Sequence, residues 1–186
     1  SASPSTVSSG EISSDKVTSP AFSMEFTDRV AAKTSSAATF SFTTSAGGAL
    51  AASATDKITL NYPSGFFATS PVPTAAISGG GVTATSVAPT ATAIVLAMTG
   101  SPIAVNTAVT VTLTGLTMGA VTAGESSVSI QTSADASASP STVASGAIGD
   151  KVTSPAFSMA FTDRVAAKAS SAATFSFTTS LGGAIS

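Results

Sequence analysis

The chain has 186 residues, of which 43% are hydrophobic and only 9% are charged, and its formal net charge is −2. It contains no Cys, His or Trp, which excludes disulfide bonds, metal sites built from thiolate or imidazole groups, and the side chain that most often acts as a general base. Because these residue types are missing, we expect no enzyme and no cofactor. The few charges are scattered without a basic cluster, so we expect neither nucleic acid nor an anionic membrane as a partner.

The first segment, residues 1–14, is rich in Ser and shows no strand pattern. It opens a stretch, residues 1–50, that returns almost unchanged at residues 137–185, with a spacing of about 135 residues. The sequence therefore predicts a tandem array, seen here as one whole period and the opening third of the next. We interpret residues 1–14 as a linker at the end of a preceding repeat, because extended connectors have this composition.

Two strands are predicted next, at residues 22–26 and 38–42, where apolar side chains occupy every second position. Each strand should place its Phe side chains on one buried face. In the second copy Ala160 replaces Glu25, while the Phe and Met positions around it are retained. This replacement is expected if position 25 faces solvent.

Further strands are predicted at five places: residues 57–62, 82–87, 93–98, 109–114 and 127–131. The longest apolar run, which ends at Met98, suits a central strand covered on both faces and is too short to span a bilayer. About seven short strands joined by Gly, Pro and Ser turns predict an antiparallel, immunoglobulin-like β-sandwich at residues 15–134. The side chains expected inside it are Phe22, Phe26, Phe40, Phe42, Ile58, Leu60, Val95, Val111, Leu113 and Ile130.

Residues 135–149 largely repeat the sequence of residues 1–14, and we interpret them as a second linker. An alternative is that residues 143–148 form an extra edge strand. Residues 150–186 hold only the first two predicted strands of the next repeat. Because a two-stranded ribbon with bare Phe side chains is marginal in water, we expect another segment or chain to complete it.

The strand and turn patterns also carry a resemblance. They are AATFSFTT at 37–44, DKITL at 56–60, YPSGF at 62–66 and AVTVTLTG at 108–115. Together these runs resemble tandem immunoglobulin-like β-sandwich repeats in very large extracellular surface and filament proteins of microbes and algae. The resemblance implies an extracellular structural or adhesive role and implies no catalytic residue.

Acidic residues and aromatic residues supply two further candidates. Asp15, Asp28, Asp56, Glu125 and Asp135 are spread without the short spacing of a calcium loop, so they fit charges at turns better than a metal site. One aromatic group, Tyr62, Phe66 and Phe67, lies beside a Pro/Ser/Gly turn. It is a candidate loop site for carbohydrate and equally fits a core position.

Small residues flank most prolines, and this pattern suits O-linked sugar on Ser, Thr or hydroxyproline as well as it suits ordinary turns. The glycosylation candidates are Pro4, Ser5, Thr6, Pro140, Ser141 and Thr142. The sequence thus predicts a structural repeat of an extracellular filament, appendage or cell-surface coat, whose partners are neighbouring repeats, identical chains or glycans. The alternative is an adhesin module that binds carbohydrate or another surface through its loops.

Overall fold

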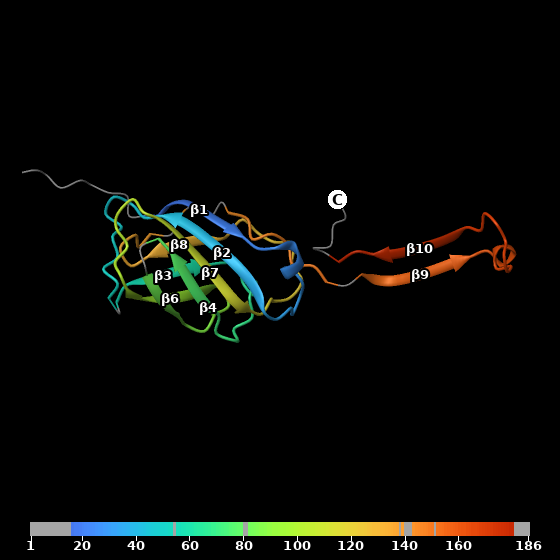
Figure 1. The fold of residues 1–186 in the computed structure, drawn as a ribbon, viewed down its shortest axis with the longest axis horizontal. Coiled ribbons are helices and arrows are strands. Elements are labelled where there is room, and N and C mark those ends of the chain that lie inside the picture. Colours follow the sequence, from blue (N-terminus) through green and yellow to red (C-terminus); the bar gives the residue numbers. More distant parts are fainter. Residues whose placement is uncertain are drawn as a thin grey trace, which may run out of the picture.

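The computed structural model describes residues 16–53, 55–79, 82–137, 139, 143–150 and 152–180. These residues form ten β-strands and two single-turn 3-10 helices, arranged in two four-stranded sheets and one two-stranded sheet (Figure 1). All pairings between these strands are antiparallel. The prediction of an all-β chain with antiparallel sheets is confirmed. The described part of residues 15–134 holds eight strands, β1 to β8, where seven were expected, and the second copy holds the two strands expected of it.

The first sheet has the strand order β1-β2-β7-β4. Its central strands, β2 (Ser36–Thr43) and β7 (Ala108–Leu116), pair along their whole length, with Phe40 opposite Val111. Inward and outward side chains alternate along β2 because successive side chains of a strand point to opposite faces. The outer strands are β1 (Thr18–Ser23) and β4 (Thr74–Ser78).

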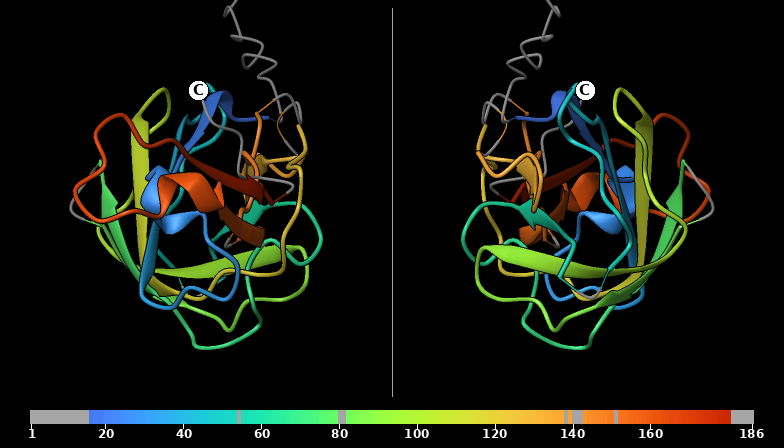
Figure 2. Two further views of the ribbon diagram at one scale, coloured as in Figure 1. Left: turned by 90° about the vertical axis from the view of Figure 1, so that its right-hand side faces the viewer. Right: turned by 90° about the vertical axis from the view of Figure 1, so that its left-hand side faces the viewer.

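The second sheet has the strand order β5-β6-β3-β8. Its strands are β5 (Val82–Ser86), β6 (Ala93–Gly100), β3 (Lys57–Asn61) and β8 (Ser129–Thr132). Together the two four-stranded sheets and their connections, residues 16–150, form what we call the two-sheet unit. Figure 2 views this unit from its two ends and shows the strands arranged around one interior.

A single apolar core lies between the two sheets. Eight of the ten expected core side chains are in it or packed against it, but Phe26 and Val95 were predicted wrongly. Phe26 is 72% exposed because β1 ends at Ser23 and the chain enters a 3-10 turn, η1 (Phe26–Asp28), so the strand alternation no longer applies. In β6 the fully buried side chains are Ile94, Leu96 and Met98, so Val95 faces outward.

The strand β4 was not predicted from the sequence. Its only large apolar side chain is Ile77, and its remaining residues are Thr, Ala and Ser. It forms because the edge of β7 offers backbone hydrogen-bonding groups along residues 110–114. Tertiary pairing, which the local sequence does not reveal, thus determines this strand.

Residues 135–149 were expected to be a linker, but their described part packs against residues 122–130 of the two-sheet unit. Backbone bridges join Val143 to Val128 and Ile148 to Thr122. The hydroxyl of Ser139 accepts a hydrogen bond from the Ile130 N–H at 2.9 Å, and that of Ser145 accepts one from the Glu125 N–H at 3.1 Å. The Ser side chains of this segment are therefore buried and hydrogen-bonded to backbone groups. The segment is nearer to the alternative of an added edge strand than to a free linker.

The chain enters and leaves the two-sheet unit at opposite ends. β1 begins at Thr18, opposite Thr43, and runs toward η1. Beside η1 the terminal segment ends, where the Gly149 N–H donates to the Arg29 carbonyl at 2.9 Å and the Gly149 carbonyl accepts from the Ala31 N–H at 2.8 Å. The two ends are therefore separated by more than the length of β1, which is about 20 Å. We call them the leading end, near Thr18, and the trailing end, near Gly149.

Beyond the trailing end, the second copy forms a two-stranded hairpin of β9 (Thr153–Met159) and β10 (Ala173–Thr178), joined through η2 (Phe161–Asp163). Figure 1 shows it extending away from the two-sheet unit. We expected another segment to complete it, and none of the described residues does so. The first-copy hairpin is completed by strands from residues 57–132, and the second copy does not reach the equivalents of those strands.

Candidate interaction surface

The predicted aromatic loop group lies in the core, so it forms no exposed platform. Tyr62, Phe66 and Phe67 are all buried, and their rings stack edge to face with centroids 4.9 Å apart. The Tyr62 hydroxyl donates to the Thr90 carbonyl at 3.0 Å, and burial raises the pKa of this phenol above its ordinary value. The interpretation of these residues as a carbohydrate site is therefore wrong, and their alternative role as core residues is correct.

The glycosylation candidates are not placed by the structure. Pro4, Ser5, Thr6, Pro140, Ser141 and Thr142 all lie outside the described residues. The outward side chains of the central strands, by contrast, are described, and they include Thr39 and Ser41 on β2 and Thr110 and Thr112 on β7. Hydroxyl groups thus cover the outer face of the first sheet.

The acidic residues do not converge. Asp28 pairs with Lys33, Asp56 accepts hydrogen bonds from Ser53 and Ser133, and among the described residues no three acidic groups lie close enough to hold a metal ion. Lys33 and the Ala37 N–H both hydrogen-bond to the Asp28 carboxylate, and they lower its pKa below the ordinary value. This contribution to stability is present above the ordinary pKa of Asp and is lost as the pH falls through the lowered value.

Asp135 has a structural role that the sequence did not indicate. Its side chain is fully buried at the leading end, where its carboxylate accepts hydrogen bonds from the Ser45 N–H at 3.0 Å and from the Ser45 hydroxyl. A side chain on Gly48 would overlap this carboxylate. Asp135 therefore fixes the turn after β2 to the turn after β8.

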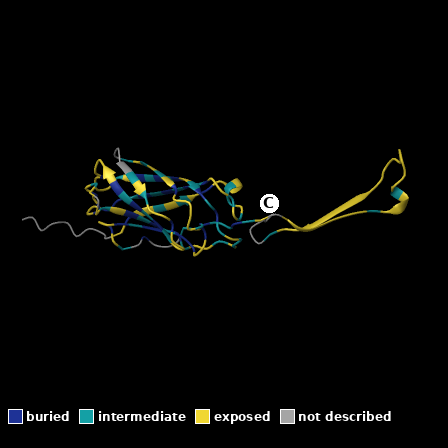
Figure 3. Ribbon diagram, turned by 90° about the horizontal axis from the view of Figure 1, so that it is seen from below, coloured by how far each residue is buried: buried dark blue, intermediate teal, exposed yellow. Residues whose placement is uncertain are grey.

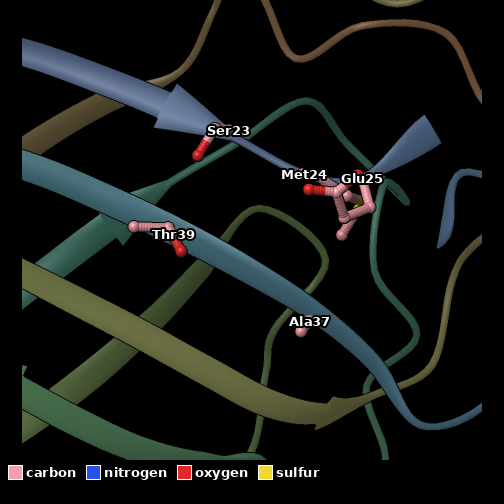
Figure 4. Close-up of a pocket in the computed structure, with 5 residues that line it drawn as sticks. All are labelled: Ser23, Met24, Glu25, Ala37 and Thr39. Atoms are coloured by element: carbon pink, nitrogen blue, oxygen red, sulfur yellow. The ribbon is translucent and has the colours of Figure 1, made fainter.

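A shallow hollow lies where β1 ends beside the start of β2 (Figure 4). It is lined by Ser23, Met24, Glu25, Ala37 and Thr39. Its only charged group is the Glu25 carboxylate, which the second copy replaces with Ala160. Ser23 and Thr39 add two hydroxyl groups to the lining beside this single carboxylate.

The apolar surface of the second copy is the most distinctive exposed feature of the molecule. Phe175 is 74% exposed, whereas its counterpart Phe40 is fully buried. Figure 3 shows the same contrast between the two-sheet unit, which has a buried interior, and the hairpin, which is exposed along nearly its whole length. Exposed apolar patches of this kind mark interaction surfaces.

The hairpin has the same conformation in both copies, although only the first is packed in a two-sheet unit. The ring centroids of Phe22 and Phe40 are 4.9 Å apart, and those of Phe157 and Phe175 are 5.0 Å apart. Ser19 and Ser154, which are equivalent, both have a positive φ, of 49° and 50°. The two hairpins therefore share this ring contact and this backbone conformation.

The loop of the hairpin is also maintained locally. In the first copy the Lys33 ammonium pairs with Asp28 and donates to the Thr27 carbonyl at 2.7 Å. In the second copy Lys168 pairs with Asp163 in the same way and donates to the Thr162 carbonyl at 2.8 Å. These ion pairs lie within one loop, so they do not join neighbouring repeats.

Within the described residues, no helix has the length and apolar character needed to cross a membrane. Comparison of the chain with models of protein families, with curated proteins and with solved structures gave no match.

Proposed function

We propose that the two-sheet unit is an immunoglobulin-like β-sandwich that recurs in tandem, and that the array is a structural element of an extracellular filament, appendage or cell-surface coat. The observation that carries this proposal is the placement of the two chain ends. The chain enters at the leading end and leaves at the trailing end, where the second copy begins. Units joined in this way add length along one axis, as repeat proteins do.

The strand arrangement supports the immunoglobulin-like part of the proposal. Immunoglobulin domains place strands A, B, E and D in one sheet and strands C, F and G in the other. Here β1, β2, β7 and β4 occupy the positions of A, B, E and D, while β3, β8 and residues 143–149 occupy those of C, F and G. One departure is that β4 precedes β5 and β6 in the chain.

The composition supports the extracellular location. Hydroxyl side chains cover the outer face of the first sheet, and only 9% of all residues are charged. A surface with so few charges has little electrostatic protection against lateral sticking. We propose that O-linked sugars on the candidates at 4–6 and 140–142 supply further hydration.

Intact mass spectrometry of the native protein tests this function, because it reports polypeptide length and attached sugar together. We expect a mass that corresponds to several periods of about 135 residues, with increments of hexose or pentose. After enzymatic or chemical removal of glycans, the protein should have the single mass of its unmodified polypeptide. A native polypeptide that contains one period only would contradict the array, and an unmodified mass would contradict the glycans alone.

A further inference from the structure

The last stretch of the two-sheet unit, residues 137–149, is held in its described part by paired hydrogen bonds and by a buried apolar side chain. We call this stretch the closing segment. Ser145 exchanges two hydrogen bonds with Glu125, since its hydroxyl accepts from the Glu125 N–H at 3.1 Å and its own N–H donates to the Glu125 carbonyl at 2.8 Å. Ile148 is fully buried and exchanges two backbone hydrogen bonds, of 2.9 and 3.2 Å, with Thr122. Both side chains and backbone therefore fix the closing segment.

The closing segment also lies against a cation. Gly146 has a φ of 75°, which favours glycine, and a methyl group added to it would overlap the Arg29 guanidinium. The Nε atom of Arg29 is buried and has no hydrogen-bond partner among the described residues, and Arg29 forms no ion pair with any of them. A buried donor of a charged group is costly to leave unpaired. An anionic group next to Gly146 would therefore be stabilised at this place.

Residues 1–14 carry the same contact residues as the closing segment. Residues 1–12 match residues 137–148 at every position except two. The residues that are buried or face the core, and the glycine beside Arg29, return unchanged as Ser3, Val7, Ser9, Gly10 and Ile12, the equivalents of Ser139, Val143, Ser145, Gly146 and Ile148. The two differences fall at the exposed Ala144 and the half-buried Ala147. Residues 1–14 thus retain the side chains by which the closing segment is bound.

One of the two differences adds a carboxylate. Glu11 replaces Ala147 and directly follows Gly10, the equivalent of the glycine that lies against Arg29. The replacement therefore introduces an anionic group beside the position at which the site has an unpaired cation. In charge as well as in shape, residues 1–14 fit the site that the closing segment occupies.

We propose that residues 1–14 are the closing segment of another two-sheet unit, in which Ile12 is buried opposite Thr122 and Glu11 pairs with Arg29. In the tandem array this unit is the preceding one. The inference rests on the proposed array and names the contact that joins one unit to the next. Each unit is then closed by the first residues of the following sequence period, and only residues 150–152 separate the closing segment from the next strand, β9.

A chain extended by one unit tests the proposal. A copy of residues 16–136 is joined before Ser1, so that residues 1–14 follow it as residues 137–149 follow residue 136. Ile12→Ser should raise the unfolding equilibrium constant of the added unit about a hundredfold, because it removes a buried apolar side chain. The original unit should be unaffected, so unfolding in urea should separate into two transitions.

Ser8→Ala is the matched control, because the equivalent position in the closing segment, Ala144, is exposed. It should change the unfolding constant of the added unit by less than about twofold. Glu11→Gln should raise this constant about threefold at low salt. It should have no effect when Arg29 of the added unit is replaced by Gln, since the pair is then already lost.

Three outcomes would overturn the proposal. The first is an added unit that does not unfold cooperatively or that is insensitive to Ile12→Ser, because residues 1–14 would then be a linker. The second is an equal loss of stability from Ile12→Ser and Ser8→Ala. The third is an effect of Glu11→Gln that is the same with and without Arg29. None of them depends on the length of the native polypeptide, so failure here is distinct from failure of the proposed array, which the intact mass tests.

Discussion

Replacement of Phe40 by Ala should destabilise the two-sheet unit by about 3–5 kcal/mol, the usual range for truncating a buried Phe. Phe40 is fully buried in the core and lies opposite Val111 on the neighbouring strand. The free energy of unfolding in urea, measured at a concentration where the chain is monomeric, gives this difference.

The same substitution in the second copy provides the matched comparison. Phe175 occupies the equivalent position in a hairpin of the same conformation, but it packs against no second sheet. Phe175→Ala should therefore change the unfolding free energy of the two-sheet unit by less than about 0.5 kcal/mol. Equal losses for the two substitutions would show that the second hairpin is part of the same cooperative unit, contrary to the structure.

Replacement of Gly119 by Ala should have a comparably large effect, because backbone rather than side-chain atoms occupy the space. An added methyl group would overlap the carbonyl oxygen of Gly65 and lie 2.8 Å from its carbonyl carbon. The Gly119 N–H also donates to the Phe66 carbonyl at 2.9 Å, which prevents the two segments from separating without loss of a hydrogen bond. We expect a loss of about 3 kcal/mol, the upper end of the cost of overpacking.

Gly115→Ala is the control for Gly119→Ala. Gly115 has a φ of +78°, but nothing lies within 4 Å of an added methyl group. It should cost about 1 kcal/mol, which reflects only the strain of a left-handed backbone. Thermal unfolding of both variants tests the comparison, and a loss for Gly115→Ala as large as that for Gly119→Ala would contradict the close approach between Gly119 and Gly65.

The sequence predicted the strands whose apolar side chains alternate. Phe40 and Phe42 on β2, and Val111 and Leu113 on β7, are separated by polar residues, so the pattern defines both the strand and its inward face. The apolar residues of β6 are consecutive, so the sequence does not show which of them face inward. For that reason Val95 was predicted on the wrong side of the strand. Alternation was also extended too far at Phe26, where a 3-10 turn replaces the strand.

Other features depend on contacts between residues far apart in the sequence. Ser139 and Ser145 have the composition of a linker, and only their hydrogen bonds to Ile130 and Glu125 show that they are packed on the unit. Tyr62 precedes a turn and Phe66 and Phe67 follow it, and these positions do not reveal whether another segment covers the three side chains. The inward alternation of β10 was predicted because it repeats that of β2. Another segment was also expected to cover the Phe side chains of this hairpin, and none of the described residues does so.

Small-angle X-ray scattering of a chain with two complete units tests the proposed array most directly. Such a chain is obtained by joining a copy of residues 44–149 after Thr178, the equivalent of Thr43. If leading and trailing ends alternate along one axis, the pair-distance distribution should show a second maximum at about 40 Å, the length of a nine-residue strand with its loops. A single maximum from two units folded side by side would contradict the account.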